Sequence, residues 1–133
     1  MASIFSRIIA GEIPCHKVAE TESCIAFMDI APLALGHVLV VPKTEVDRYF
    51  DLGDGELSEL NVFAKKVAVA IEEVVPCKRV GVAVIGLEVP HAHVHLIPLN
   101  SVSDINFERE KLEVTAEELA VVAEKISRAY RVI

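Results

Sequence analysis

The chain has 133 residues, and its 13 basic and 20 acidic side chains give a net charge of −7 at pH 7. This length predicts one domain that can bury its own core. A hydrophobic share of 53% with a charged share of 25% is typical of a folded protein. The negative charge argues against partners such as nucleic acid or an anionic membrane surface, because their phosphate groups are repelled.

Cysteine usage and the N-terminal sequence point to a compartment. The three cysteines, Cys15, Cys24 and Cys77, form no Cys-x-x-Cys pair, so neither a disulfide framework nor a cysteine-based zinc site is predicted. The N-terminal residues lack the apolar stretch of a signal peptide, and no apolar run is long enough to span a bilayer. We therefore expect a cytoplasmic protein with no membrane partner.

The first half of the chain has one short helical pattern and three strand patterns. Apolar residues at helical spacing predict a short helix within residues 4–13. Residues 17–28 are typical of two short strands around a polar turn. Residues 36–42 are typical of a third strand, rich in β-branched side chains.

The second half contains two amphipathic helical patterns. Asp54 is expected to cap a long helix that ends at Val75, just before a proline. Thr115, with Glu118 three residues later, forms a capping box at the start of the last helix. Both segments carry apolar residues in steps of three and four, so each is expected to bury one face.

Two further strands are predicted between these helices, over residues 79–85 and 91–97. Strands and helices do not alternate as they do in a βαβ fold. The fold class is therefore expected to be α+β, with a mainly antiparallel sheet, one long helix and a C-terminal helix.

Three of the five histidines, His91, His93 and His95, alternate along the last predicted strand. Alternate side chains share one face of a strand, so the imidazoles would lie about 7 Å apart on that face. They could bind a metal, act on phosphate as nucleophile, acid–base group or donor, or form a solvated polar face. The opposite face would then turn three apolar side chains toward the core: Ala92, Val94 and Leu96.

The run from His91 to Ile97 reads His-φ-His-φ-His-φ-φ, where φ is apolar, and resembles the signature of the histidine-triad (HIT) nucleotide-binding family. The resemblance extends, in order and spacing, to three more blocks, residues 4–14, 26–32 and 36–43. It covers about residues 3–98 of a single HIT-like domain over residues 1–133. Residues 99–133 are a C-terminal extension that contains the last helix.

The resemblance implies a five-stranded sheet, a homodimer and a purine nucleotide ligand. It makes His93 the nucleophile that attacks the α-phosphate, with His91 assisting it and His95 contacting the phosphate. His37 would be a further imidazole near the triad, and Asp29 would accept hydrogen bonds from the ribose hydroxyls. Apolar side chains would form the walls around the base: Phe27, Ile30, Ile4, Phe5, Ile8 and Ile13.

Taken without the resemblance, the same residues have structural interpretations that remain open. Asp29 could cap a turn before Pro32, as aspartate often does in loops. His37 could be a hydrogen-bonded structural histidine. The isoleucines could simply be core residues.

The sequence departs from the family pattern at two places. Ser3, Ser6 and Glu45 stand where many members have two cysteines and a histidine that bind zinc together with a triad histidine. Because hydroxyls bind zinc poorly, we expect no metal and no cofactor. Leu87 and Glu88 stand where the family often has glutamine and a hydroxyl residue, and we expect Glu88 to tune the preference for the leaving group.

The sequence therefore predicts a metal-independent hydrolase or transferase. It would act at the α-phosphate of purine nucleotide conjugates, nucleoside 5′-phosphoramidates above all, through a nucleotidyl-histidine intermediate. The alternative is a nucleotide-binding regulatory or interaction protein with little or no turnover, which the losses at Leu87 and Glu88 favour. A metal-dependent enzyme that uses the histidines as ligands is a third interpretation.

Overall fold

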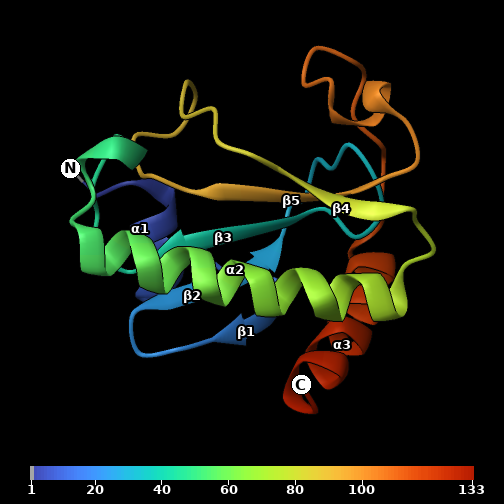
Figure 1. Ribbon diagram of the computed structural model, residues 1–133, viewed down its shortest axis with the longest axis horizontal. Helices are drawn as coiled ribbons and strands as arrows, with labels where there is room; N and C mark the ends of the chain where they lie inside the picture. The colour runs from blue at the N-terminus through green and yellow to red at the C-terminus, as the bar shows by residue number, and fades with distance from the viewer. Residues whose placement is uncertain (1) are drawn as a thin grey trace.

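An antiparallel sheet forms the centre of the fold in the computed structural model, which describes residues 2–133 (Figure 1). Its strands follow the order β1-β2-β3-β5-β4, and every neighbouring pair is antiparallel. The predicted α+β class and the five-stranded sheet are confirmed. The strands are β1 (Lys17–Glu20), β2 (Cys24–Met28), β3 (Val38–Pro42), β4 (Arg79–Ala83) and β5 (Val94–Leu99).

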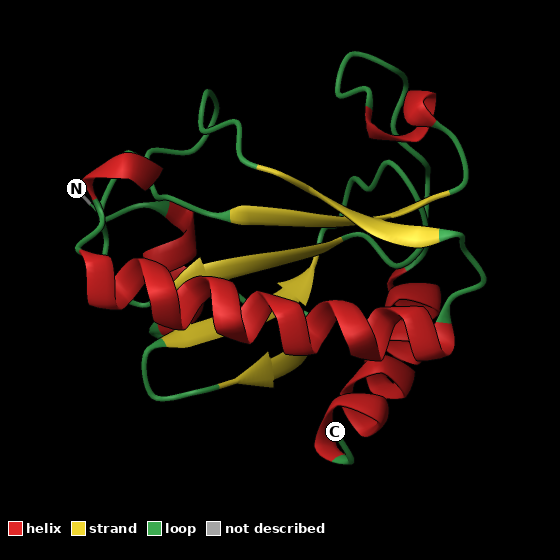
Figure 2. Cartoon of the chain, in the orientation of Figure 1, coloured by secondary structure: helices red, strands yellow, loops and turns green. Residues whose placement is uncertain are grey.

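Helices cover both faces of this sheet (Figure 2). The long helix α2 (Asp54–Val74) and the C-terminal helix α3 (Ala116–Arg131) pack on one face, and the short helix α1 (Ile4–Ile9) packs on the other. Two short 3-10 helices, Tyr49–Asp51 and Val102–Ile105, lie in the connections. Among residues 2–133, no helix combines the length and the apolar character that a membrane crossing requires.

The two amphipathic helices begin in different ways. The capping box predicted for α3 is present, since the Thr115 hydroxyl accepts a hydrogen bond from the Glu118 amide. The prediction that Asp54 caps α2 is wrong, because Gly53 occupies the capping position and Asp54 is the first helical residue. In the first turn the Asp54 carboxylate still interacts favourably with the positive end of the helix dipole.

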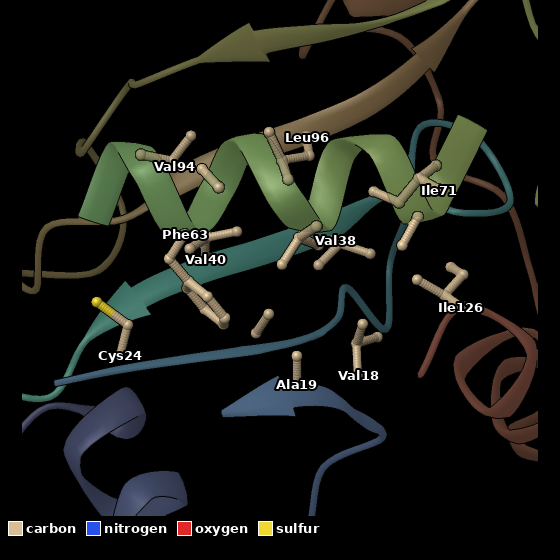
Figure 3. Packing of buried hydrophobic residues seen from close by; sticks show 14 of the residues in the cluster. Val18, Ala19, Cys24, Val38, Val40, Phe63, Ile71, Val94, Leu96 and Ile126 are labelled. Atoms are coloured by element: carbon tan, nitrogen blue, oxygen red, sulfur yellow. The ribbon is translucent and has the colours of Figure 1, made fainter. Parts of the chain in front are cut away.

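Strand alternation divides the interior into two apolar clusters. The larger one lies between the sheet and helices α2 and α3, where Val38, Val40, Val94 and Leu96 meet Phe63, Ile71 and Ile126 (Figure 3). The smaller one lies on the opposite face under α1 and consists of Phe5, Ile25, Phe27, Leu39 and Val41. Leu39 pairs with His95 in the sheet, so the histidine lies on the α1 face.

The histidine segment differs from the predicted strand. Strand β5 begins at Val94, so His91 and His93 precede it, and β4 ends at Ala83 rather than at residue 85. The Ala92 amide donates to the carbonyl of Val46 (2.7 Å) and does not join the sheet ladder. The ring centroids of His93 and His95 are consequently only 4.8 Å apart, closer than the predicted spacing of about 7 Å.

Candidate active site

Four buried imidazoles form a row on the α1 face of the sheet. His91 and His37 are 0% exposed, His93 is 6% exposed and His95 is 8% exposed. We call these residues the imidazole row. Buried imidazoles require hydrogen-bond partners, and these partners determine where each proton lies.

Gly36 positions His37 at one end of this row. Its φ of +105° is a conformation that L side chains rarely adopt. A Cβ at this position would also lie 2.8 Å from a methyl group of Val75. Glycine therefore allows the chain to turn directly into β3 and to bring His37 against His95.

His93 has a defined proton position. Its Nδ1 lies 2.8 Å from the carbonyl oxygen of His91. A carbonyl only accepts hydrogen bonds, so Nδ1 carries the proton and Nε2 of the neutral ring keeps a free lone pair. Burial lowers the pKa of His93, which favours this neutral form. His93 therefore has the protonation state that a nucleophile needs.

His95 and His37 form a hydrogen-bond chain in which, unlike in His93, each proton lies on Nε2. The amide of Leu33 donates to Nδ1 of His37 (3.1 Å), so the proton of neutral His37 lies on Nε2. Nε2 of His37 then donates to Nδ1 of His95 (3.0 Å), which leaves an N–H on Nε2 of His95. His95 can thus donate a hydrogen bond to an anionic group.

Burial keeps both of these rings neutral. It is the main reason why the pKa of His37 falls to about 3, and repulsion from His95, Lys111 and His93 adds to the effect. Burial and repulsion from His93 lower the pKa of His95 to about 4. At neutral pH the chain from Leu33 to His95 therefore transmits hydrogen bonds between uncharged rings.

Asp29 lies beside His37 and also shapes the loop. One carboxylate oxygen accepts a hydrogen bond from the amide of Ala31 (2.9 Å), so the turn-capping role left open by the sequence is present. The other oxygen lies 3.5 Å from Nε2 of His37. Burial raises the pKa of this carboxyl group. Asp29 therefore has one oxygen committed to the loop and one facing the imidazole row.

Asp29, His37 and His95 also offer ligand atoms within 4.8 Å of one another, as a metal site would. The amide of Leu33 disfavours this use. If Nε2 of His37 bound a metal, Nδ1 of the neutral ring would carry the proton and would face the Leu33 N–H. The group fits a hydrogen-bond chain better than a set of metal ligands.

Two of the residues expected to surround the base are buried next to the row. The ring of Phe5 lies 4.9 Å from the ring of His93 and 5.6 Å from that of Phe27, both edge-on. Ile8 and Ile13 are half-buried. The other two, Ile4 and Ile30, are 49% and 74% exposed. For Ile4, the open alternative of a core position is wrong.

Glu88 is exposed in the loop between β4 and β5. Its negative charge contributes to raising the pKa of Asp29 and partly offsets the lowering of the pKa of His93. The next residue, Val89, packs on the small apolar cluster under α1. This packing brings the Glu88 carboxylate close enough to act electrostatically on the row.

Sequence reasoning missed the contribution of the C-terminal extension. The ring of Phe107 lies 4.7 Å from that of His95 and 6.2 Å from that of His37. Lys111 donates to the carbonyls of Phe107 and Arg109. We call residues 106–112 the covering segment. The only sequence signal was a lone aromatic residue in a strongly charged stretch.

Comparison with known proteins identifies the family of this chain. The HIT domain family model matches residues 10–102. The chain belongs to the HIT family. It is 35% identical over 130 residues to adenosine 5′-monophosphoramidase hnt1 of Schizosaccharomyces pombe, covering 96% of this chain and 97% of that protein. It is 38% identical over 98 residues to adenosine 5′-monophosphoramidase HNT1 of Saccharomyces cerevisiae, covering 73% of this chain and 62% of that protein.

Solved HIT structures share the fold. A Hit-like protein from Bartonella henselae superposes with a TM-score of 0.83 at 30% identity and covers 96% of this chain and 95% of its own. A zinc-bound histidine triad protein from Mycobacterium smegmatis superposes with a TM-score of 0.81 at 22% identity, with coverages of 98% and 94%. The second likeness concerns the fold alone.

Proposed function

We propose that this HIT protein hydrolyses purine nucleoside 5′-phosphoramidates and related AMP conjugates through a nucleotidyl-His93 intermediate. The observation that supports it most is the pair of opposite protonation states at adjacent rings. His93 presents a lone pair on Nε2, and His95 presents an N–H on Nε2. A nucleophile next to a hydrogen-bond donor is what displacement at an anionic phosphorus requires. The two yeast relatives are named as adenosine 5′-monophosphoramidases.

The reaction proceeds in two displacements at phosphorus. The leaving nitrogen takes a proton from solvent, Nε2 of His93 attacks the α-phosphorus, and the bond from phosphorus to the neutral amine breaks. The N–H on Nε2 of His95 donates a hydrogen bond to the phosphate oxygens in both steps. Water then attacks the same phosphorus, releases a proton to solvent and breaks the bond to His93. The products are AMP and the free amine. The nucleophile and the donor to the phosphate are protein groups, so this route requires neither a metal nor a cofactor.

The nucleotide would bind along the α1 face. Asp29 would accept hydrogen bonds from the two ribose hydroxyls, through the oxygen that faces the row. The rings of Phe5 and Phe27 and the neighbouring isoleucines would pack against the base. Because apolar walls distinguish bases weakly, we expect adenine and guanine conjugates to be accepted with similar affinity.

The first experiment is turnover of adenosine 5′-phosphoramidate to AMP, with EDTA present, by the wild type and by His93→Ala. We expect wild-type turnover that the substitution reduces by at least about 1,000-fold, since the covalent route is lost. His16→Ala is the matched control, because His16 lies outside the imidazole row. AMP binding by each variant shows whether the site is still folded.

The alternative is a nucleotide-binding protein with little turnover, and the Leu87 side chain favours it. Leu87 is 87% exposed and offers no hydrogen bond at a position where the family often has a polar donor. AMP binding without hydrolysis by the wild type, unchanged in His93→Ala, would establish this alternative and overturn the enzymatic proposal.

Glu88 is proposed to tune the leaving group. A carboxylate near the phosphate opposes anionic leaving groups and favours cationic amines. Glu88→Ser should therefore raise kcat/KM for dinucleoside polyphosphates relative to phosphoramidates. Unchanged activity on both substrate classes would rule out this role.

We further propose a homodimer, supported by the free edge of β4. Among residues 2–133 this strand pairs only with β5, and an exposed apolar patch begins in it and continues into the next loop: Val82, Val84, Ile85 and Leu87. A dimeric mass in sedimentation that becomes monomeric in Val82→Lys is the expected result; a monomeric wild type would contradict it.

We also infer a cytoplasmic location, in keeping with the free thiols of Cys15, Cys24 and Cys77.

A further inference from the structure

Four polar side chains from three separate segments of the sequence meet at the His91 end of the imidazole row. Ser3 Oγ lies 2.7 Å from Nδ1 of His91, and the Ser3 amide donates to the Glu45 carboxylate (2.8 Å). The hydroxyl of Ser6 donates to the same carboxylate oxygen (2.6 Å). We call Ser3, Ser6, Glu45 and His91 the amino-terminal polar cluster. Ser3 and His91 are both buried.

The hydrogen bonds of this cluster determine the position of each proton. Nε2 of His91 lies 2.8 Å from the carbonyl of Pro42 and must donate to it. Nδ1 of the neutral ring is then an acceptor, and Ser3 donates its hydroxyl proton to it. Ser3 Oγ in turn accepts from the amide of Ser6 (3.0 Å). One serine side chain therefore caps helix α1 and holds the ring of His91.

The cluster is connected to the nucleophile through the main chain of His91. The carbonyl of His91 accepts the Nδ1 proton of His93. The ring and this carbonyl belong to one residue, so hydrogen bonds that anchor the ring also restrain the main chain that carries the carbonyl. Phe5 lies in the helix that Ser3 caps. The centroid of its ring is 5.8 Å from that of His91 and 4.9 Å from that of His93.

The cluster does not fit zinc. Many HIT proteins bind zinc at these positions through two cysteines and two histidines, but here the donors are two hydroxyls, a carboxylate and one imidazole. Neutral hydroxyls are poor zinc ligands. The lone pair of His91 Nδ1 that would face a metal already accepts the Ser3 proton.

We propose that Ser3 is a positioning residue that replaces the metal with hydrogen bonds. The carbonyl of Pro42 sets the tautomer of His91, and the Ser3 hydroxyl holds the other ring nitrogen, so the ring is anchored at both ends. This anchoring steadies the His91 carbonyl that accepts from His93. Glu45 supports Ser3 by accepting from its amide, and by accepting from Ser6 it leaves Ser3 as the donor to His91. The catalytic consequence rests on the function proposed above, whereas the hydrogen bond between Ser3 and His91 does not.

The first test compares Ser3→Ala with two further variants. Ser3→Thr keeps the hydroxyl, and Thr115→Ala removes an equivalent cap from α3, where Thr115 accepts from the Glu118 amide (3.1 Å). The readouts are the nitrogen NMR resonances of the His91 ring, which report the hydrogen bond at Nδ1, and kcat and KM for adenosine 5′-phosphoramidate.

For Ser3→Ala we expect the Nδ1 resonance of His91 to move to that of an acceptor nitrogen without a donor, and kcat to fall about ten-fold with little change in KM. Ser3→Thr should restore both, and Thr115→Ala should change neither. A wild-type Nδ1 resonance and rate in Ser3→Ala would overturn the proposal. If the wild type shows no turnover at all, the function proposed above fails, and the NMR measurement still decides the role of Ser3.

The second test uses zinc itself. Because the four side chains converge, the triple variant Ser3→Cys, Ser6→Cys, Glu45→His should bind one zinc ion per chain in elemental analysis, and the wild type should bind none. Stoichiometric zinc in untagged wild type would overturn the proposal. A folded triple variant that binds no zinc would contradict the convergence on which it depends.

Discussion

The two ends of the imidazole row are held in different ways. At the His91 end, the Ser3 hydroxyl donates to Nδ1 of the ring, Nε2 donates to the carbonyl of Pro42, and Glu45 accepts from the Ser3 amide. At the His95 end, the ring of Phe107 from the covering segment packs edge-on against His95. The first end is polar and the second is largely apolar. The difference indicates that one end orients His93 while the other keeps its neighbours uncharged.

Among the substitutions that test this comparison, the one at His37, on the His95 side of the row, is expected to have the largest effect. His37→Asn removes the donor to Nδ1 of His95, so Nε2 of His95 no longer has to carry the proton. We expect kcat/KM for adenosine 5′-phosphoramidate to fall about 100-fold, which corresponds to about 2.7 kcal/mol in the transition state. The same substitution at His16, outside the row, is the control. A loss of less than about three-fold would mean that His95 keeps its tautomer without His37.

The second prediction concerns stability at acid pH. The pKa values of His37 and His95 are about 3 and about 4 in the folded protein, against about 6.5 in the unfolded chain. As pH falls below about 6.5, the unfolded chain binds protons that the folded protein excludes. The free energy of unfolding should therefore fall with pH, by up to about 1.4 kcal/mol per pH unit for each ring.

Asp29 acts in the opposite direction, because its pKa is raised in the folded protein. Its contribution to stability is greatest at low pH and is lost as pH rises through its folded pKa. Urea unfolding in steps from pH 7 to pH 4 measures the sum. In His37→Asn one of the two imidazole contributions is absent, so the slope should be about half as steep. An equal slope in both proteins would show that His37 is not the group responsible.

Substitution of Phe107 tests the His95 end of the row directly. Phe107→Ala admits water to His95 and His37, so the pKa values of both rings should rise toward their ordinary range. The acid limb of the pH–rate profile should move to higher pH, and activity at pH 5 should fall about ten-fold while activity at pH 8 changes little. Phe107→Leu keeps an apolar cover and should behave like the wild type. Equal losses at both pH values would instead indicate a general disturbance of the site.

The sequence predicted part of each end of the imidazole row and missed part of each, for physical reasons. Strand alternation and the triad spacing placed His95 on one face and Val94 and Leu96 on the other, as the structure has them. The start of β5 was predicted too early, because the tertiary bond from Ala92 to Val46 cannot be read from local pattern. Phe107 was missed for a similar reason, since its contact with His95 depends on how a long connection folds back.

Substitution of Lys111 should have the smallest effect on activity. It tests whether the covering segment acts through its position or through the charge and hydrogen bonds of Lys111. Its ammonium group donates to the carbonyls of Phe107 and Arg109, and the amide of Leu112 next to it donates to the carbonyl of Pro32 (2.9 Å). Lys111→Met removes the two side-chain bonds and the charge but leaves the Leu112 bond and the Phe107 ring in place.

We expect the activity of Lys111→Met at pH 7 to stay within about two-fold of the wild type, because each exposed or half-exposed hydrogen bond contributes about 1 kcal/mol or less. Two effects act on the acid limb in the same direction. In the wild type the charge of Lys111 lowers the pKa of His37, so losing that charge raises this pKa. A loosened Phe107 would raise it further. The control is Lys125→Met, on the exposed face of α3. If Lys111→Met shifts the acid limb as far as Phe107→Ala does, the lysine rather than the ring keeps the His95 end uncharged.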